Sequence, residues 1–298
     1  MTRVIALGEC MVELGLTGPD RAQIGYAGDS FNTAIYLRRL GIETAYATAL
    51  GAGDPFSQAI LAAMAEEGLA ADLVVQVPGR LPGLYAIQRD PQGERRFFYW
   101  RGEAPAREYL SLIDPAKLEA TFREADLVYL SAISLAIVGD AGRTALMRAL
   151  AEVGPAVAFD TNYRTPLWSG PQAALAAIEA VAPLCRYLSL GAQDATALGE
   201  DDAEALARRW AHEGTEVILR CDDRRIAVFS ADRVESFAAE PAVEAVDTTG
   251  AGDSFNAGYL AARLQGRDVG EAVVGARRLA GVVVQHPGAI IPRSAMPG

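Results

Sequence analysis

Residues 247–258 read DTTGAGDSFNAG, and the rest of the chain is best interpreted outward from this stretch. A glycine-rich loop over 250–252 leads directly into a run with small residues on the first turns of a helix. Glycines let backbone N–H groups approach an anion closely, and a helix N-terminus adds a partial positive charge. The stretch therefore predicts a cradle for an anion, such as a phosphoryl group during transfer.

Asp253 stands at the edge of this cradle, where a carboxylate can accept the proton of an attacking hydroxyl. The alternative is that Asp253 only caps the helix, as Asp often does. Two other phosphate-binding loops are excluded by spacing. The stretch is neither GxGxxG after a first strand nor GxxxxGK followed by Ser or Thr.

Around this stretch, short apolar runs alternate with helical patterns, which predicts a mainly parallel sheet with helices on both faces. The predicted strands are Val4–Leu7, Thr44–Leu50, Leu127–Ser131, Ala156–Asp160, Tyr187–Leu190 and Val217–Arg220. The predicted helices are Ser30–Leu40, Ser57–Glu67, Ala141–Glu152, Pro171–Ala182, Ala203–Glu213, Asp253–Leu264 and Gly270–Gln285.

One region breaks the alternation. Leu84–Gln88 and Arg95–Trp100 read as two strands joined by a turn signal at 90–93, and residues 10–27 also look extended. Ligands of open α/β sheets bind at the carboxyl ends of the parallel strands. We therefore expect a small sheet, drawn from about 10–28 and 80–103, to act as a lid over that edge.

Composition limits the partners. The chain has 298 residues, a net charge of -11 and no long apolar run, which opposes nucleic acid and membrane partners and favours a cytoplasmic location. Three scattered cysteines and two histidines offer little for a disulfide framework or a zinc site. We expect one domain over 1–298.

Two motifs carry a family resemblance. Residues 247–255 (DTTGAGDSF) and 28–34 (GDSFNTA) resemble the C-terminal and N-terminal signatures of the ribokinase-like (PfkB) carbohydrate kinases. Finer matches resemble the members of that family that act on 2-dehydro-3-deoxygluconate (KDG). They are residues 8–14 (GECMVEL), 80–85 (RLPGLY), 98–101 (FYWR), 162–164 (NYR) and 288–292 (GAIIP).

The resemblance implies a ribokinase-like three-layer sandwich with a mainly parallel central sheet and a small β-sheet lid. It also implies ATP-dependent phosphorylation of the terminal hydroxyl of KDG, with Mg²⁺ bound to the phosphates of ATP. The product would be 2-dehydro-3-deoxy-6-phosphogluconate. The implied catalytic residues are the base Asp253 and the anion hole Gly250, Ala251 and Gly252. The implied substrate contacts are Gly28, Asp29, Asn32, Tyr85, Tyr99, Arg101 and Arg164. The implied nucleotide contacts are Asn162, Arg164, Arg220, Asp222, Arg225, Gly250, Gly252 and Arg277.

The two arginines on the acceptor side have a physical reason. KDG carries a carboxylate, which Arg101 and Arg164 can each bind with paired donors. Tyr99 shares a face with Arg101, and Tyr85 lies on the partner strand, although aromatics of an edge hairpin can also simply pack on the core. Asp29 has the alternative role of capping the helix that follows it.

Three departures from the family pattern lie on the nucleotide side. Residues 191–194 read GAQD where many members have Asn-x-x-Glu, so Asp194 would contribute to Mg²⁺ binding only through water. Residues 220–225 read RCDDRR, without the usual glycines. Arg277 replaces a small residue or Asn near the adenine.

The alternatives are another sugar or sugar-acid kinase, namely a fructokinase, a ribokinase or a 2-dehydro-3-deoxygalactonate kinase, or a sugar-acid sensor without ATP binding. Because exposed lid edges tend to be covered, we also expect a homo-oligomer.

Overall fold

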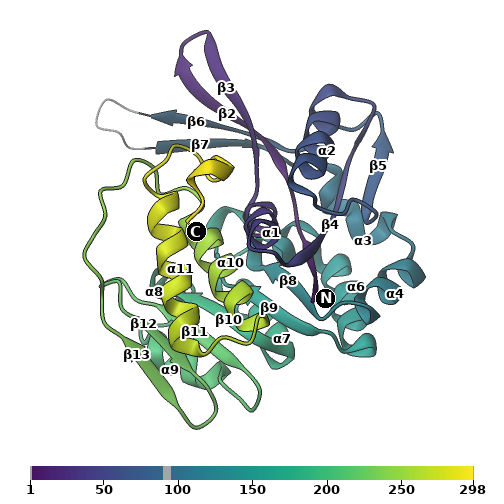
Figure 1. The fold of residues 1–298 in the computed structure, drawn as a ribbon. Helices are drawn as coiled ribbons and strands as arrows, with labels where there is room; N and C mark the ends of the chain where they lie inside the picture. Colours follow the sequence, from purple (N-terminus) through teal and green to yellow (C-terminus); the bar gives the residue numbers. More distant parts are fainter. Residues whose placement is uncertain (1, 90–94, 298) are drawn as a thin grey trace.

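The computed structural model describes residues 2–89 and 95–297, and its centre is a nine-stranded sheet (Figure 1). The strands from β11 to β5 run parallel, whereas β12 and β13 form an antiparallel extension at one edge. In spatial order they are β13 (Val234–Phe237), β12 (Ile226–Phe229), β11 (Glu216–Arg220), β10 (Cys185–Gly191), β9 (Ala156–Asp160), β8 (Leu127–Ser131), β1 (Arg3–Leu7), β4 (Glu43–Ala52) and β5 (Val74–Pro78).

Helices cover both faces of this sheet, because its strand side chains alternate between two separate cores. On β1, Val4 and Ala6 enter one core while Ile5 and Leu7 enter the other. The first core also contains residues of α1 (Asp29–Arg39), α2 (Pro55–Glu67), α10 (Ala251–Leu264) and α11 (Val269–Val283). The second contains residues of α3 (Tyr109–Leu112), α4 (Pro115–Arg123), α5 (Ala132–Ile137), α6 (Gly139–Val153), α7 (Pro171–Val181), α8 (Ala192–Ala197) and α9 (Ala203–Trp210). The expected three-layer α/β sandwich is confirmed.

A second sheet of four strands projects from the body as the predicted lid (Figure 1). Its spatial order is β3 (Arg21–Ala27), β2 (Met11–Gly18), β6 (Leu84–Arg89) and β7 (Arg95–Trp100). Its small core joins side chains of β2, β3 and β6 to Ala289. The predicted turn at 90–93 lies outside the described residues. We call this four-stranded sheet the lid sheet.

The six predicted strands and seven predicted helices are all present; β8 and β9 have the predicted bounds, and the others have shifted ends. The largest shift is in α9, which ends at Trp210 instead of Glu213. His212 lies outside the helix, where its ring contacts the Thr215 hydroxyl and the Ala182 carbonyl. Sequence patterns missed the short edge strands β5 and β13, the strand β12 between β13 and β11, and the helices α3, α4, α5 and α8.

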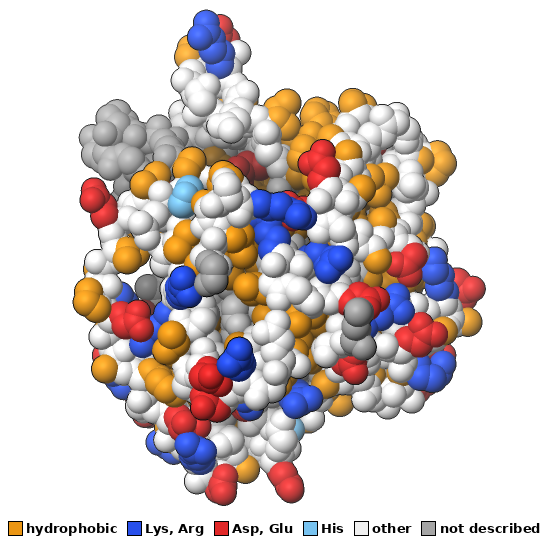
Figure 2. Space-filling model, in the orientation of Figure 1, with side chains coloured by type: hydrophobic (Ala, Val, Ile, Leu, Met, Phe, Trp, Pro, Cys, Tyr) orange, Lys and Arg blue, Asp and Glu red, His pale blue; other side chains and the backbone are white. Residues whose placement is uncertain are grey.

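The molecular surface is mixed in character. Basic side chains lie among acidic ones on the face shown in Figure 2, and the tip of the β2–β3 hairpin stands clear of the body. Across the described ranges, 2–89 and 95–297, every helix is too short or too polar to cross a membrane.

Candidate active site

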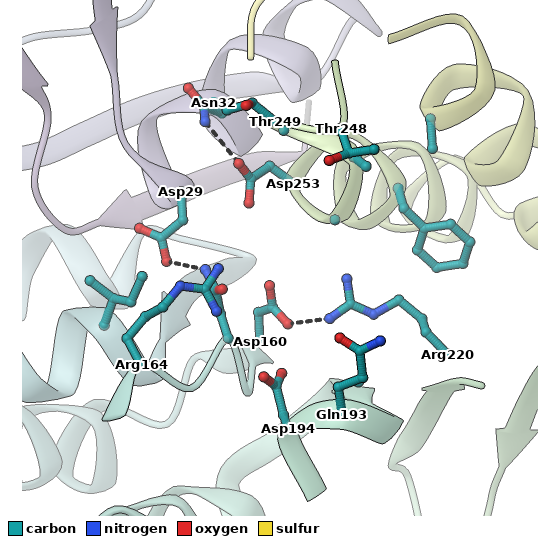
Figure 3. Close-up of a pocket in the computed structure, with 18 of the residues that line it drawn as sticks. Asp29, Asn32, Asp160, Arg164, Gln193, Asp194, Arg220, Thr248, Thr249 and Asp253 are labelled. Atoms are coloured by element: carbon teal, nitrogen blue, oxygen red, sulfur yellow. Dashed lines mark hydrogen bonds and ion pairs between the residues drawn. The ribbon is translucent and has the colours of Figure 1, made fainter. Parts of the chain in front are cut away.

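A cavity of about 1470 Å³ opens at the carboxyl ends of the parallel strands, beneath the lid sheet. Its walls come from the segments that follow β1, β9, β10 and β11, from the loop before α10, and from the lid sheet. Parallel sheets gather their ligand sites at this edge. Most of the predicted site residues meet here although they are distant in the sequence, as Figure 3 shows for Asp29, Asn32, Arg164, Asp194, Arg220 and Asp253.

The loop before α10 has the geometry of an anion cradle. Gly250 is the N-cap residue at φ 76°, and a Cβ there would lie 2.6 Å from the Ala289 carbonyl oxygen. Only glycine fits both requirements. The N–H groups of Ala251, Gly252 and Asp253 belong to the first turn of α10, where no carbonyl of the same helix is available, although the Ala251 N–H donates to the Thr248 carbonyl at 3.3 Å. These donors and the helix dipole favour a negative group at the cavity.

Asp253 lies on the first turn of α10 and is almost completely buried at the cavity wall. One carboxylate oxygen accepts a hydrogen bond from Asn32 Nδ2 at 2.8 Å, on the first turn of α1 (Figure 3). The helix is capped by Gly250 without any side-chain cap, so the alternative role of Asp253 as a simple helix cap is wrong.

The pKa of Asp253 is raised well above its ordinary value, chiefly by burial and then by the nearby charge of Asp29. Asp160 raises it further, whereas the hydrogen bond from Asn32 and the charge of Arg164 lower it. A raised pKa makes the carboxylate a stronger proton acceptor, which suits a general base.

Asp29 lines the same cavity opposite Asp253 (Figure 3). It does not cap α1, whose N-cap residue is Gly28 with no side-chain cap, so that alternative is wrong as well. Instead, Asn162 Nδ2 donates to Asp29 Oδ2 at 3.0 Å. Asn162, which we predicted on the nucleotide side, therefore contacts a residue of the acceptor side.

The lid sheet supplies an aromatic and basic wall. Tyr85 and Tyr99 are paired across β6 and β7, with ring centroids 5.8 Å apart, and both line the cavity. Tyr85 donates a hydrogen bond to Glu13, and Arg101 forms an ion pair with Glu9. Tyr85, Tyr99 and Arg101 thus lie on one wall of the cavity, and Tyr85 also packs in the small core of the lid sheet, as the alternative expected.

Glu9 was missed in the sequence, although it follows β1 at the edge where functional residues gather. Its side chain is 1% exposed beside Arg101, and burial raises its pKa. A Cβ at Gly83 would lie 2.5 Å from a Glu9 carboxylate oxygen, so glycine at 83 makes room for this carboxylate.

A second buried ion pair connects β9 to β11 beneath the anion cradle. Arg220 Nη2 donates to Asp160 Oδ1 at 2.9 Å, and Asn256 Nδ2 donates to Asp160 Oδ2 at 2.9 Å. Burial raises the pKa of Asp160 to about 6 although Arg220 lowers it. A Cβ at Gly252 would lie 2.7 Å from Arg220 Nη1, so the guanidinium lies directly against the cradle.

Arg164 follows β9 and lies in the middle of the cavity wall. Figure 3 shows its side chain beside Asp29 and Asp160. One of its nitrogens donates to the Tyr163 carbonyl at 3.0 Å, and its charge lowers the pKa of both Asp160 and Asp253. It is therefore close enough to act on either the acceptor or a phosphate at the cradle.

The remaining nucleotide-side residues divide into two groups. Asp222 and Arg277 line the main cavity, whereas Arg225 lines a shallower hollow beside α9. Arg225 is exposed and bonded to Asp223, its neighbour in the β11–β12 turn. The structure does not bring Arg225 into the main cavity with the other predicted nucleotide contacts.

Asp194 lines the cavity at the start of α8, and both its oxygens accept hydrogen bonds. Thr161 Oγ1 donates at 2.7 Å, and the Tyr163 N–H donates at 3.3 Å. Within residues 2–89 and 95–297, no three His, Cys, Asp or Glu side chains gather as a metal-binding cluster. Each Asp194 oxygen keeps a lone pair that can accept a further bond. Asp194 therefore suits a Mg²⁺ ion that is also bound by phosphate oxygens better than a metal ion bound by protein side chains alone.

Known proteins are similar to this chain in sequence or in fold. The 2-dehydro-3-deoxygluconokinases of Dickeya dadantii and Escherichia coli (strain K12) are each 37% identical to this chain. Both alignments cover 99% of this chain, and they cover 98% of the Dickeya protein and 99% of the Escherichia protein. A solved fructokinase of Xylella fastidiosa with bound ATP has the same fold, with a TM-score of 0.81 and 21% identity over 99% of this chain and 95% of that one.

A family model described as "pfkB family carbohydrate kinase" matches residues 1–296. The match includes the lid sheet, the anion cradle and every residue discussed above. The chain belongs to the pfkB family of carbohydrate kinases.

Proposed function

We propose that the chain transfers the γ-phosphoryl group of ATP to the terminal hydroxyl of KDG. The observation that carries the proposal is the position of Asp253, a buried carboxylate of raised pKa on the same helical turn as the N–H groups of the anion cradle. The two relatives at 37% identity bear the name of this activity.

The geometry supports a direct transfer. The acceptor hydroxyl gives its proton to Asp253, its oxygen bonds to the γ-phosphorus, and the bond from that phosphorus to the bridging oxygen of ADP breaks. The Gly252 N–H on the first turn of α10, with Arg220 behind it, stabilises the negative charge on the phosphoryl oxygens. Phosphoryl transfer needs mainly such positioning and charge stabilisation.

The acceptor half of the cavity supports an acidic sugar. Arg101 and Arg164 stand on two of its walls, and Asp29 and Asn32 offer partners to hydroxyl groups. Guanidinium groups bind carboxylates with paired, charge-assisted hydrogen bonds. A neutral sugar would leave unused the donors of Arg164 and those donors of Arg101 that Glu9 does not occupy.

The nucleotide half supports ATP with Mg²⁺. The Xylella fructokinase, whose fold this chain shares, was solved with ATP bound. Asp194 is the residue that would hold Mg²⁺, through water, when the ion arrives on the phosphates; there it would neutralise part of their charge.

The homo-oligomer expected from the lid sheet stays a prediction.

An ADP-release assay over a panel of acceptors tests the substrate. KDG should be the best acceptor, with kcat/KM at least about tenfold above fructose and ribose, because only the acid can use a charge-assisted bond. Equal kcat/KM for KDG and fructose would contradict the sugar-acid assignment. Tight KDG binding without ADP release would identify a sensor instead.

The acid preference should depend on Arg101. Because Arg101→Ala alone leaves buried Glu9 unpaired, the variant is Arg101→Ala with Glu9→Gln, and Glu9→Gln is its control. The double variant should have a KM for KDG about tenfold above the control, with an unchanged KM for ATP. The same KM for KDG in the double variant and the control would show that Arg101 does not bind the acceptor.

The pH profile should report on Asp253. Activity requires the ionised carboxylate, so kcat/KM falls as pH drops through its pKa. The hydrogen bond from Asn32 lowers that pKa. Asn32→Ala should therefore move the acid limb of kcat/KM to higher pH. Gln193→Ala, which changes a cavity residue away from Asp253, should leave the limb in place. A limb that stays, or moves to lower pH, in Asn32→Ala would contradict the assignment of Asp253.

A further inference from the structure

Two departures noted in the sequence, the β11–β12 turn without glycine and the arginine on α11, meet in the structure. The turn closes with the Arg224 N–H bonded to the Cys221 carbonyl at 3.0 Å and the Cys221 N–H bonded to the Arg225 carbonyl at 3.0 Å. Arg224 has φ 66°, in the left-handed region. A hairpin turn of this kind prefers glycine at the left-handed position. Arg224 is therefore held in a conformation that its side chain disfavours.

Arg277 holds this turn from the neighbouring helix. Its Nη2 donates to the Arg224 carbonyl at 3.1 Å and to the Phe237 carbonyl at 3.2 Å, and its Nη1 lies 3.4 Å from a Glu240 carboxylate oxygen. Its side chain is only 13% exposed. One guanidinium thus joins the β11–β12 turn, the end of β13 and the irregular segment that follows β13.

These three segments belong to the nucleotide half of the cavity. Its wall here contains Asp222 and Arg224 of the turn, residues 240–243 after β13, and Arg277 itself. The segment over 238–246 has no helix or strand, and most of its residues are exposed. Without a bond from outside, such a segment keeps conformational freedom that a ligand must remove on binding.

We infer that Arg277 is a positioning residue of the nucleotide site, which holds the non-glycine turn at Arg224 and residues 237–240 in the arrangement that receives ATP. Its donors are already directed at protein oxygens, so it acts through these segments and not as a direct ligand of the nucleotide. Arg224 and Arg277 form one unit, because the hydrogen bond from Arg277 stabilises the turn that Arg224 strains. The inference rests on the proposed use of ATP.

The test compares Arg277→Ala with Arg278→Ala, its exposed neighbour on α11. We expect Arg277→Ala to raise both the KM for ATP and the Kd for ATP, measured by calorimetry without acceptor, about tenfold, while the KM for KDG stays within twofold. Arg278→Ala should match the parent protein. Arg277→Lys should not restore binding, because an ammonium lacks the planar fork that serves several acceptors at once.

The coupling of the two positions is the sharper part of the test. Glycine at position 224 adopts the left-handed conformation without strain. The double variant Arg224→Gly with Arg277→Ala should therefore bind ATP more tightly than Arg277→Ala alone, with a Kd at least about threefold lower. Strictly additive effects, or an Arg277→Ala protein with the parent's Kd for ATP, would overturn the inference. If the parent protein itself neither binds nor consumes ATP, the proposed function fails first, and this outcome is distinct because it appears before any substitution is made.

Discussion

Asp253→Asn is expected to lower kcat for KDG phosphorylation at least about 100-fold, the largest effect we expect on activity. Asparagine has nearly the same shape and can keep a contact with Asn32, but its amide does not accept the proton of the acceptor hydroxyl. The N–H groups of the anion cradle stay in place because Gly250 caps α10 independently of Asp253. The Kd for ATP should therefore stay within about threefold of the parent value, so the loss should be in kcat.

The matched control is Asp268→Asn, because Asp268 is an aspartate that does cap a helix. Its side chain accepts from the Glu271 N–H at the start of α11, in a capping box. This variant should lose at most about 1 kcal/mol of unfolding free energy and keep its kcat. If Asp253→Asn retained more than a tenth of the parent kcat, the assignment of Asp253 as general base would be wrong.

The sequence predicted those parts of the site that lie within one continuous motif. The anion cradle and Asp253 share residues 247–258, where glycine spacing and helix start are visible together. The alternation of strands and helices also predicted the three-layer fold, because the hydrophobic periodicity of each strand or helix is visible within a short stretch of sequence. The lid sheet was predicted as a separate hairpin and an extended segment, but the parallel pairing of β2 with β6 joins strands about 70 residues apart and has no local signature.

The ion pairs of the site were not predictable. Arg101 pairs with Glu9 across 92 residues, and Arg220 pairs with Asp160 across 60. Both arginines were identified as site residues, but nothing in the local sequence says which carboxylate neutralises each one. The same holds for Asn162, whose partner Asp29 is 133 residues away. Arg225 was placed with the nucleotide contacts because it is close in sequence to Arg220, yet the turn directs it to Asp223.

Arg220→Met is expected to lower the unfolding free energy by about 3 kcal/mol at pH 8, because it leaves Asp160 buried and unpaired. The Asp160 side chain is 2% exposed, and Asn256 is its other hydrogen-bond donor near the cavity. Adding Asp160→Asn removes the unpaired charge, so the double variant should regain most of the stability in urea denaturation. Its kcat should stay at least about tenfold below the parent value, because Arg220 is the cation that lies against Gly252 in the anion cradle.

The matched control for this pair is the exposed one between Arg148 and Glu152 on α6, where both side chains are more than half exposed. Arg148→Met should change the unfolding free energy by less than about 0.5 kcal/mol, because water already screens that pair. If Arg148→Met and Arg220→Met lowered the unfolding free energy equally, the effect would come from removing an arginine in general and not from leaving the buried Asp160 carboxylate unpaired.

The loss caused by Arg220→Met should also depend on pH in one direction. Burial raises the pKa of Asp160 to about 6 even with Arg220 beside it, and removing that positive charge raises the pKa further. A carboxyl whose folded pKa lies above its unfolded value destabilises the fold increasingly as pH rises between the two values. The stability gap between parent and Arg220→Met should therefore be largest at pH 8 and shrink towards pH 5, where Asp160 in the variant is protonated. A gap that is constant over this range would mean that the charge of Asp160 is not what Arg220 neutralises.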